Sequence, residues 1–308
     1  MMKGVKWRVK AFLEYARFQR KIFAATRAAH AQEAHGRQRS VPLCFVAGCG
    51  RSGTTLLGRL LSLYPDIVYL NEPRPYWITV SKRTEIWGYC RSEEKQRSLL
   101  IEDPRPGEAA RFAALFSAAG SGSRLLVEKT PENVFRLPWL HSLAPDAKLI
   151  YIVRNGYDVI RSILVEADFD IPYGFRDMNN WYGTRDKKKR LLAQTAREFG
   201  IAPQVVDSCT TSPDWAALEW VCSNRAFERH KQYFIGPGLF EVRYEELTTE
   251  TWEIYSKLLG FLNLSATKDL QGEIMGYVRP GRPSAPKAEL APGIRELFES
   301  EQIRLGYL

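Results

Sequence analysis

Residues 44–61 read CFVAGCGRSGTTLLGRLL: an apolar run, a glycine turn, and then residues of helical periodicity. This order is typical of a phosphate-binding loop between a buried parallel strand and a helix. Nucleoside-triphosphate enzymes write that loop G-x-x-x-x-G-K-[ST], with a lysine that reaches the β- and γ-phosphates. Here Gly48 and Gly53 have the required spacing and Thr55 fills the last position, but Thr54 replaces the lysine. We therefore expect a loop that binds an anion through backbone N–H groups at a helix N-terminus, without a γ-phosphate ligand.

A second segment of the same kind, KLIYIVRNGYDVIRS, covers residues 148–162. A strand that ends in a loop and a helix, found twice, predicts βαβ units and a parallel sheet. Because such sheets bind ligands at the carboxyl ends of their strands, the glycine turn and Arg154 should share one edge. Arg154 and Ser162, eight residues later, could grip a second phosphate, although a surface salt bridge of Arg154 is the alternative. The predicted fold is α/β, with a P-loop-like central parallel β-sheet flanked by helices.

The net charge of +9 is concentrated at the N-terminus, since residues 1–40 hold ten Lys or Arg and two Glu. The remaining chain is close to neutral, so we expect no nucleic-acid partner for its body. Residues 1–40 are predicted to form a basic helical arm, which either packs on the domain or contacts a membrane surface or an anionic substrate. No apolar run is long enough for a transmembrane helix, and no secretory signal is recognised.

The five cysteines are scattered without a C-x-x-C pair, which favours reduced thiols and a cytoplasmic location. The four histidines lack metal-ligand spacing, so no metal is expected to be required. Residues 41–308 are predicted to form a single domain, in which 167–214 are an insertion on the substrate side, part wall and part solvated face. The oligomeric state is not predicted.

GCGRSGTT and YIVRNGYDVIRS resemble the two signature motifs of the sulfotransferases that use 3′-phosphoadenosine 5′-phosphosulfate (PAPS). YPDIVYLNEPRPYW and EKTPENVFRLPWL are similar to further segments of carbohydrate, tyrosyl-protein and bacterial members. The resemblance implies a single sulfotransferase domain that releases 3′,5′-bisphosphoadenosine (PAP). It implies that Arg154 and Ser162 bind the 3′-phosphate, and that YVRPGRPSAPK is the candidate for the adenine-side tail. The 5′-phosphosulfate would be bound by the loop, namely Gly48, Cys49, Gly50, Arg51, Ser52, Gly53, Thr54 and Thr55.

The resemblance also implies that Arg51 stabilises the oxygen on which charge grows during transfer, as fixed cations do in phosphoryl transfer. Lys129 of EKTPEN is the second candidate cation, with a salt bridge to Glu128 or Glu132 as the alternative. An acceptor hydroxyl must lose a proton, and with few histidines a carboxylate is the natural base. Glu72 of LNEPRP matches the position of the family's catalytic glutamate. Its rivals are Asp66 and Glu128.

The acceptor is not identified by the sequence. Aromatic residues could stack on a sugar or another flat ring, or could equally belong to the core: Tyr76, Trp77, Trp87, Trp181 and Tyr182. Arg74 could meet an acidic acceptor, or pair with Asp66 or Glu85. Carbohydrate or glycolipid, small hydroxylated metabolite and peptidyl tyrosine all remain open. The competing functions are a P-loop small-molecule kinase that uses ATP and Mg²⁺, and a nucleic-acid or membrane-binding module led by the basic arm.

Overall fold

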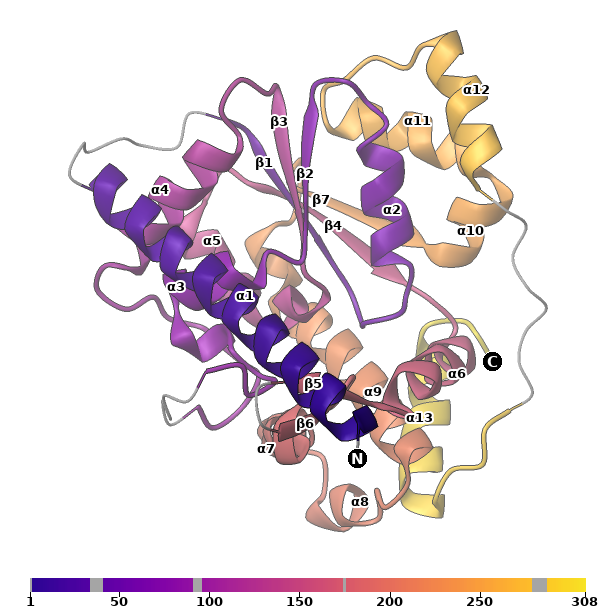
Figure 1. Ribbon diagram of the computed structural model, residues 1–308. Coiled ribbons are helices and arrows are strands. Elements are labelled where there is room, and N and C mark those ends of the chain that lie inside the picture. The colour runs from indigo at the N-terminus through magenta and orange to yellow at the C-terminus, as the bar shows by residue number, and fades with distance from the viewer. Residues whose placement is uncertain (1, 34–40, 91–95, 174–175, 279–286) are drawn as a thin grey trace.

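A computed structural model describes residues 2–33, 41–90, 96–173, 176–278 and 287–308. At its centre lies one parallel sheet of five strands in the order β2-β3-β1-β4-β7 (Figure 1). The strands are β1 Leu43–Ala47, β2 Ile67–Asn71, β3 Leu125–Lys129, β4 Lys148–Val153 and β7 Leu239–Arg243. The predicted α/β class is therefore confirmed, and β1 lies in the middle of the sheet.

The sheet is buried on both faces. Successive side chains of a strand point to opposite sides, and on each side they pack into an apolar core. In β1, Phe45 and Ala47 join one apolar core, whereas Cys44 and Val46 join the other. The central strand is consequently a continuous apolar run, which is the pattern that made it recognisable in the sequence.

Helices form the outer layers (Figure 1). The side that receives Phe45 is covered by α3 Arg74–Val80, α4 Glu108–Ala119, α5 Leu137–Leu143, α6 Gly156–Ala167, α9 Ser212–His230 and α13 Pro292–Arg304. The side that receives Val46 is covered by α2 Thr54–Leu61, α11 Thr251–Phe261 and α12 Lys268–Tyr277. The short helix α10 Tyr244–Thr249 follows β7 directly.

The segment between α6 and α9 carries a small antiparallel hairpin, β5 Asp170–Tyr173 with β6 Arg176–Asn179, followed by α7 Lys187–Glu198 and α8 Pro203–Asp207. The helix expected after the second predicted strand is confirmed as α6. In the short helix α10, directly after β7, Thr248 and Thr249 donate back to the Glu245 carbonyl.

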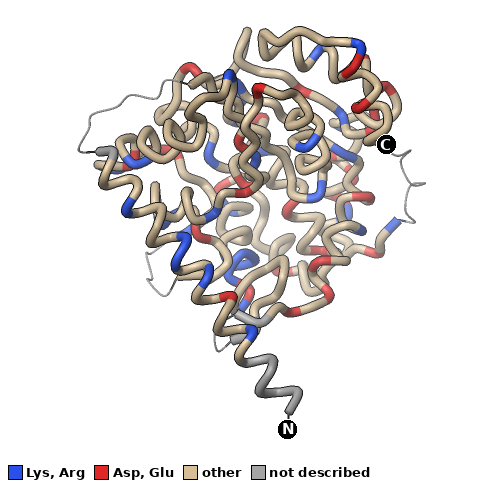
Figure 2. Tube along the Cα trace, turned by 45° about the horizontal axis from the view of Figure 1, so that its top comes forward, with Lys and Arg blue, Asp and Glu red and all other residues tan. Residues whose placement is uncertain are grey.

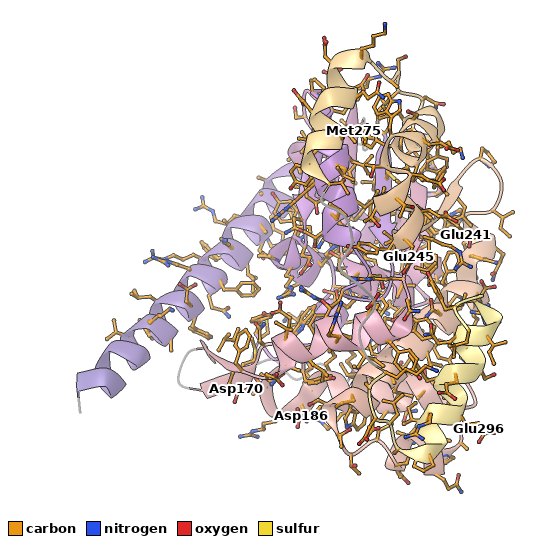
Figure 3. The ribbon with its side chains drawn as sticks, turned by 90° about the vertical axis from the view of Figure 1, so that its right-hand side faces the viewer. Asp170, Asp186, Glu241, Glu245, Met275 and Glu296 are labelled. Atoms are coloured by element: carbon orange, nitrogen blue, oxygen red, sulfur yellow. The ribbon has the colours of Figure 1, made fainter. Side chains whose placement is uncertain are left out.

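The N-terminal arm is a long helix, α1 Met2–Glu33, that lies across α3, α4 and β5. Its inward stripe includes the buried residues Ala11, Ala25 and Ala29, and Gln19 donates a hydrogen bond to the Tyr89 carbonyl at 3.0 Å. Figure 3 shows the first turns of α1 projecting beyond the rest of the molecule. The arm is therefore helical and docked along part of its length.

Candidate functional site

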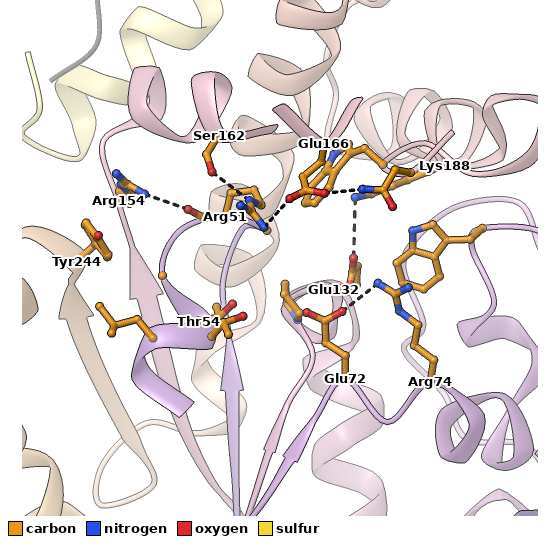
Figure 4. A pocket seen from close by; sticks show the side chains of 18 residues that line it. Arg51, Thr54, Glu72, Arg74, Glu132, Arg154, Ser162, Glu166, Lys188 and Tyr244 are labelled. Atoms are coloured by element: carbon orange, nitrogen blue, oxygen red, sulfur yellow. Dashed lines mark hydrogen bonds and ion pairs between the residues drawn. The ribbon is translucent and has the colours of Figure 1, made fainter. Parts of the chain in front are cut away.

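A cavity of about 460 Å³ opens at the carboxyl edge of the sheet, where the glycine turn after β1 and the loop after β4 meet (Figure 4). The two segments are neighbours because β1 and β4 pair in parallel, as expected from the sequence. The lining comes from both motifs, from the segments that follow β2 and β3, from α6 and the segment after it, and from the start of α10: Gly50, Arg51, Gly53, Thr54, Thr55, Leu56, Glu72, Arg74, Trp87, Pro131, Glu132, Arg154, Ser162, Glu166, Asn180, Trp181, Lys188 and Tyr244.

The loop needs its glycines for close packing. Gly53 has φ 96°, and a Cβ there would lie 2.3 Å from the ring of Tyr244. A Cβ on Gly50 would lie 2.5 Å from the ring of Trp181. Larger residues are thus excluded from the positions where the loop turns into α2 and where it passes beneath Trp181.

Lys129 joins the loop to the predicted base. It is the last residue of β3, which lies between β2 and β1, and its side chain is fully buried. Its Nζ donates to Thr55 Oγ1 at 2.9 Å and to Glu72 Oε1 at 2.6 Å. The alternative pairing of Lys129 with Glu128 or Glu132 is not what the structure has. One ammonium group therefore lies between the phosphate loop and a carboxylate.

Glu72 immediately follows β2 and is held on two sides. Its Oε2 accepts from Arg74 at 2.9 Å, and its backbone N–H donates to the Lys129 carbonyl at 2.7 Å. Burial alone would raise the pKa of Glu72, but the charges of Arg74 and Lys129 outweigh it and hold the pKa below its ordinary value. The carboxylate is consequently ionised and acceptor-only at neutral pH.

Glu128, a rival for the role of base, does not line this cavity. It is fully buried, and its carboxylate accepts from Trp77 Nε1, Thr130 Oγ1 and Asn133 Nδ2 at 2.6–2.9 Å. Burial raises its pKa to about 7. The other rival, Asp66, is exposed before β2, at the opposite end of that strand from Glu72.

The second motif contacts the first directly. Arg51 Nε donates to Ser162 Oγ at 3.0 Å, and Arg154 donates to the Arg51 carbonyl at 3.3 Å. Arg51 also pairs with Glu166 of α6 at 3.3 Å. Arg154, Ser162 and the loop thus surround one end of the cavity (Figure 4).

Two buried polar atoms at this end have no hydrogen-bond partner among the described residues, Ser52 Oγ and Arg154 Nε. The guanidinium of Arg154 lies 4.0 Å from the ring centroid of Tyr244. Unsatisfied buried donors are costly, and in a functional site they indicate a place for a ligand. The donors here suit an anion.

The opposite end of the cavity is built around Lys188, which is 1% exposed. Its Nζ lies 2.8 Å from Glu219, 3.8 Å from Glu132, and 4.0 Å from the ring centroid of Trp181. Trp181 Nε1 donates to Glu219 at 2.9 Å. Glu132 is nearly buried, and its Oε2 has no partner among the described residues. A hydrogen-bond acceptor therefore remains available on this wall.

The aromatic residues suggested for the acceptor separate into two groups. Trp87 and Trp181 line the cavity, and Arg74 stacks 4.0 Å from the ring centroid of Trp87. Of the two alternatives left open for Trp77, the structure has the core and not the substrate wall, because Trp77 is 2% exposed and packs against Phe45, Phe112 and Trp139. Tyr182 is buried as well, and Tyr76 lines a separate groove.

Arg74 also departs from the sequence-based alternatives. It binds Glu72 and the Tyr89 hydroxyl, not Asp66 or Glu85. Glu85 instead pairs with Lys187 at 2.8 Å and accepts from the backbone N–H of Trp87, Gly88 and Tyr89. The arginine is thereby fixed beside the predicted base.

Sequence reasoning missed several residues of the cavity. Lys188 lies in the charge run DKKKR, which reads as a solvated face. Only its helical spacing to the apolar residues Leu191 and Leu192 of α7 could have indicated one inward lysine. Glu166, Asn180 and Tyr244 carried no recognisable signal. Most of YVRPGRPSAPK, residues 279–286, lies outside the described residues.

Other chemistry finds little support in the part of the chain that is described. Burial raises the pKa of the Cys49 thiol well above its ordinary value, as expected for a filler residue in the loop. All five cysteines are described, and each is a free thiol. No cluster of three or more His, Cys, Asp or Glu suitable for a metal occurs among the described residues. Likewise, none of the described helices has the length and apolar character to cross a bilayer.

Comparison with known proteins identifies a protein family whose model matches most of the chain. Residues 42–269 match the family model described as "Sulfotransferase family". The nodulation protein NoeE of Sinorhizobium fredii is 33% identical over 143 residues, covering 42% of this chain and 32% of that protein. A protein-tyrosine sulfotransferase of Drosophila melanogaster is 25% identical over 159 residues, covering 49% of this chain and 31% of that protein. The chain thus spans about a third of the length of these relatives.

Solved structures share the fold. The sulfotransferase STF9 from Mycobacterium avium superposes with a TM-score of 0.56 at 14% identity, over 94% of this chain and 86% of that chain. The sulfotransferase domain from the curacin biosynthetic pathway gives a TM-score of 0.50 at 16% identity, over 88% of this chain and 99% of the domain.

Proposed function

This chain belongs to the sulfotransferase family, and on that premise we propose that it transfers a sulfuryl group from PAPS to a hydroxyl or amine group of its acceptor. The observation that carries the proposal is the position of Lys129, whose Nζ contacts both Thr55 of the phosphate loop and Glu72. Anion site, cation and carboxylate are thus connected by two hydrogen bonds at the edge of three adjacent strands.

The residues present fit a donor with a 5′- and a 3′-phosphate. Residues Gly48–Thr55 would hold the 5′-phosphosulfate through the N-terminus of α2, where the buried Ser52 Oγ has no hydrogen-bond partner within the described part of the chain. Arg154 and Ser162 would hold the 3′-phosphate, and Arg154 Nε, which donates to none of the described residues, supports this assignment. The family's use of PAPS and the missing γ-phosphate lysine point to the same donor.

The donor supplies the sulfuryl group: the bond from sulfur to the acceptor oxygen forms, the bond from sulfur to the phosphate oxygen breaks, and PAP leaves with the electron pair. Glu72 takes the proton of the acceptor hydroxyl. Lys129 and Arg51 offset the negative charge that grows on the departing oxygens, as preorganised cations do in related transfers. Arg51 must then give up part of its contact with Glu166.

The acceptor is proposed to lie between Glu72 and the Lys188 end of the cavity. Trp87 and Trp181 would flank it, and Glu132 Oε2, which has no hydrogen-bond partner among the residues that the structure describes, would accept a hydrogen bond from it. A molecule with more than one hydroxyl fits this lining best, because two carboxylates both require donors. A carbohydrate headgroup or a small hydroxylated metabolite satisfies this requirement.

The proposal is tested by thermal shift against PAP, ATP with Mg²⁺, and an oligonucleotide. PAP at 100 times its Kd should add about 2.7 kcal/mol of stability, and it should do so in the presence of EDTA, because N–H groups and arginine hold the phosphates. A shift with ATP and Mg²⁺ alone would favour the kinase. A shift with the oligonucleotide alone would favour a nucleic-acid module. We do not expect this shift, because Lys and Arg are interspersed with Asp and Glu over the body of the molecule (Figure 2).

The cytoplasmic location and the absence of a metal requirement remain predictions. So does the reading of residues 41–308 as one sulfotransferase domain with a substrate-side insertion at 167–214. Lys188 and Trp181 of that insertion line the proposed acceptor site, which supports its assignment to the substrate side.

A further inference from the structure

A second hollow, a groove of about 610 Å³, runs between α1, α3 and α4. Its wall from α1 is formed by Phe18, Lys21, Ala24, Ala25 and Ala28. The facing wall consists of Pro73, Pro75, Tyr76, Leu115 and Ala118. Apart from the lysine, these side chains are apolar or aromatic, and the three alanines of α1 keep the groove open.

One end of this groove reaches the proposed catalytic residues. Glu72 and Arg74 line both the groove and the cavity at the sheet edge, and Asn71 lines the groove beside them. The two hollows therefore adjoin at the predicted base. From that junction the cavity leads to the charged groups Lys188 and Glu132, whereas the groove leads over apolar side chains toward α1.

A molecule that occupies both hollows must have two chemically different parts. The part in the cavity meets carboxylates, a lysine and two indole rings, and so must carry hydrogen-bond donors. The part in the groove gains by removing apolar surface from water and is offered few polar partners. The lining of a site selects for matching chemistry along its length.

We propose that the acceptor is an amphiphile, whose hydroxylated headgroup lies at Glu72 and whose alkyl or acyl chain lies in the groove between α1 and α3. The inference rests on the proposed function for the position of the reacting hydroxyl. It goes beyond that function in assigning α1 a role in choosing the acceptor. A fully polar sugar or metabolite would leave the groove without an occupant.

The experiment measures binding of hexyl and decyl maltoside to the full chain below their micelle concentrations, by calorimetry, with and without PAP. Each methylene moved from water into an apolar site favours binding by about fourfold at most. Because the groove is open on one side, the four extra methylenes should raise affinity by about tenfold or more.

Three substitutions test whether the alkyl chain of the maltoside lies in the groove. Ala24→Phe and Ala28→Phe, at exposed positions of α1 that line the groove, should reduce the preference for decyl over hexyl to about twofold or less. Ala118→Phe fills the groove from α4 and should act alike without altering α1. Ala31→Phe, at an exposed position of α1 outside the groove lining, is the matched control and should keep the preference.

Equal affinity for the two maltosides would overturn the proposal. So would a chain-length preference that all three groove-filling variants retain, since the chain would then bind elsewhere. PAP affinity, measured on the same preparations, shows whether each variant is folded and has an intact donor site, independently of the groove. If the wild-type protein did not bind PAP, the proposed function would fail. The affinity ratio of decyl to hexyl maltoside would still decide whether the groove binds an alkyl chain.

Discussion

Glu72 and Arg51 both hold backbone conformations that side-chain-bearing residues rarely adopt, with φ 48° and 69°. Such a left-handed residue costs on the order of 1–3 kcal/mol unless its surroundings fix it. For Glu72 the surroundings are identifiable: its N–H is bound to the Lys129 carbonyl, and its carboxylate to Lys129 and Arg74. Two residues with strained backbones in one cavity are typical of a preorganised binding site.

Glu72→Gln tests the assignment of the base. The amide keeps the shape and can still accept from Lys129, but it cannot take a proton. We expect kcat to fall by about 10²–10⁴-fold while PAP affinity changes little. The matched control is Asp66→Asn, an exposed carboxylate at the other end of β2, which should leave kcat unchanged. A Glu72→Gln enzyme within a few-fold of wild type would rule out this base.

The lowered pKa of Glu72 also predicts how its ion pairs with Lys129 and Arg74 depend on pH. Because the pKa of Glu72 is lowered in the folded state, its ion pairs contribute stability above the ordinary value of 4.5 and lose it as pH falls through the folded pKa. Glu72 should therefore add no acidic limb to the rate between pH 5 and 8. Acid unfolding curves of wild type and Glu72→Gln should converge at low pH, because the wild-type carboxyl is then protonated.

Arg154→Ala tests which phosphate that guanidinium binds. Loss of one charged hydrogen-bonding partner is worth about 1.5–3 kcal/mol, so PAP should bind about 10- to 100-fold more weakly. Adenosine 5′-monophosphate lacks the 3′-phosphate, and its affinity should hardly change. Arg161→Ala is the control, since both Arg154 and Arg161 pair with Asp158 of α6, at 3.9 and 3.4 Å, but Arg161 does not line the cavity. Equal losses for both nucleotides would remove Arg154 from the 3′-phosphate site.

At the scale of elements, the two strands that carry the motifs could be predicted because each contains a run of apolar residues. β1 and β4 are buried runs followed by glycine and helix, and the sequence placed both motifs on one edge. β3 was missed because it reads LLVEK, and its last two residues are charged. Glu128 and Lys129 are nevertheless fully buried, and each has a partner from a distant part of the chain: Trp77 for Glu128 and Glu72 for Lys129. A single sequence does not reveal such pairing.

The same reason limited the prediction of the acceptor site. Trp77 lies three residues after Arg74 in the sequence, yet Trp77 is in the core and Arg74 lines the cavity, because Arg74 is the first residue of α3 and Trp77 lies about one turn further into the helix. Lys188 was hidden within a run of like charges, although its environment of Glu219 and Trp181 makes it a buried residue. The donor loop, by contrast, acts through its backbone, and its glycine spacing made it readable from the sequence alone.

For the whole molecule, the distribution of charge leads to the last prediction. Within residues 9–31 of α1, five Lys or Arg accompany a single Glu, and Leu13 and Phe23 are 48% and 65% exposed. A basic helix with exposed apolar residues is suited to the surface of an anionic bilayer, where each Lys or Arg contributes about 1 kcal/mol. The first turns of α1 extend beyond the body, where they could reach such a surface (Figure 3).

We therefore expect the protein to float with vesicles that contain phosphatidylglycerol, to float much less with pure phosphatidylcholine, and to be released by high salt because the attraction is screened. The double substitution of Leu13→Ser with Phe23→Ser should weaken the binding. Ile235→Ser with Ile303→Ser, both at 63% exposed positions outside α1, is the matched control and should leave it intact. Binding that ignored lipid charge and salt, or that survived the α1 substitutions, would contradict a membrane contact through this helix. A positive result would also account for the placement of an apolar groove beneath α1, since an amphiphilic acceptor would be met at the same surface.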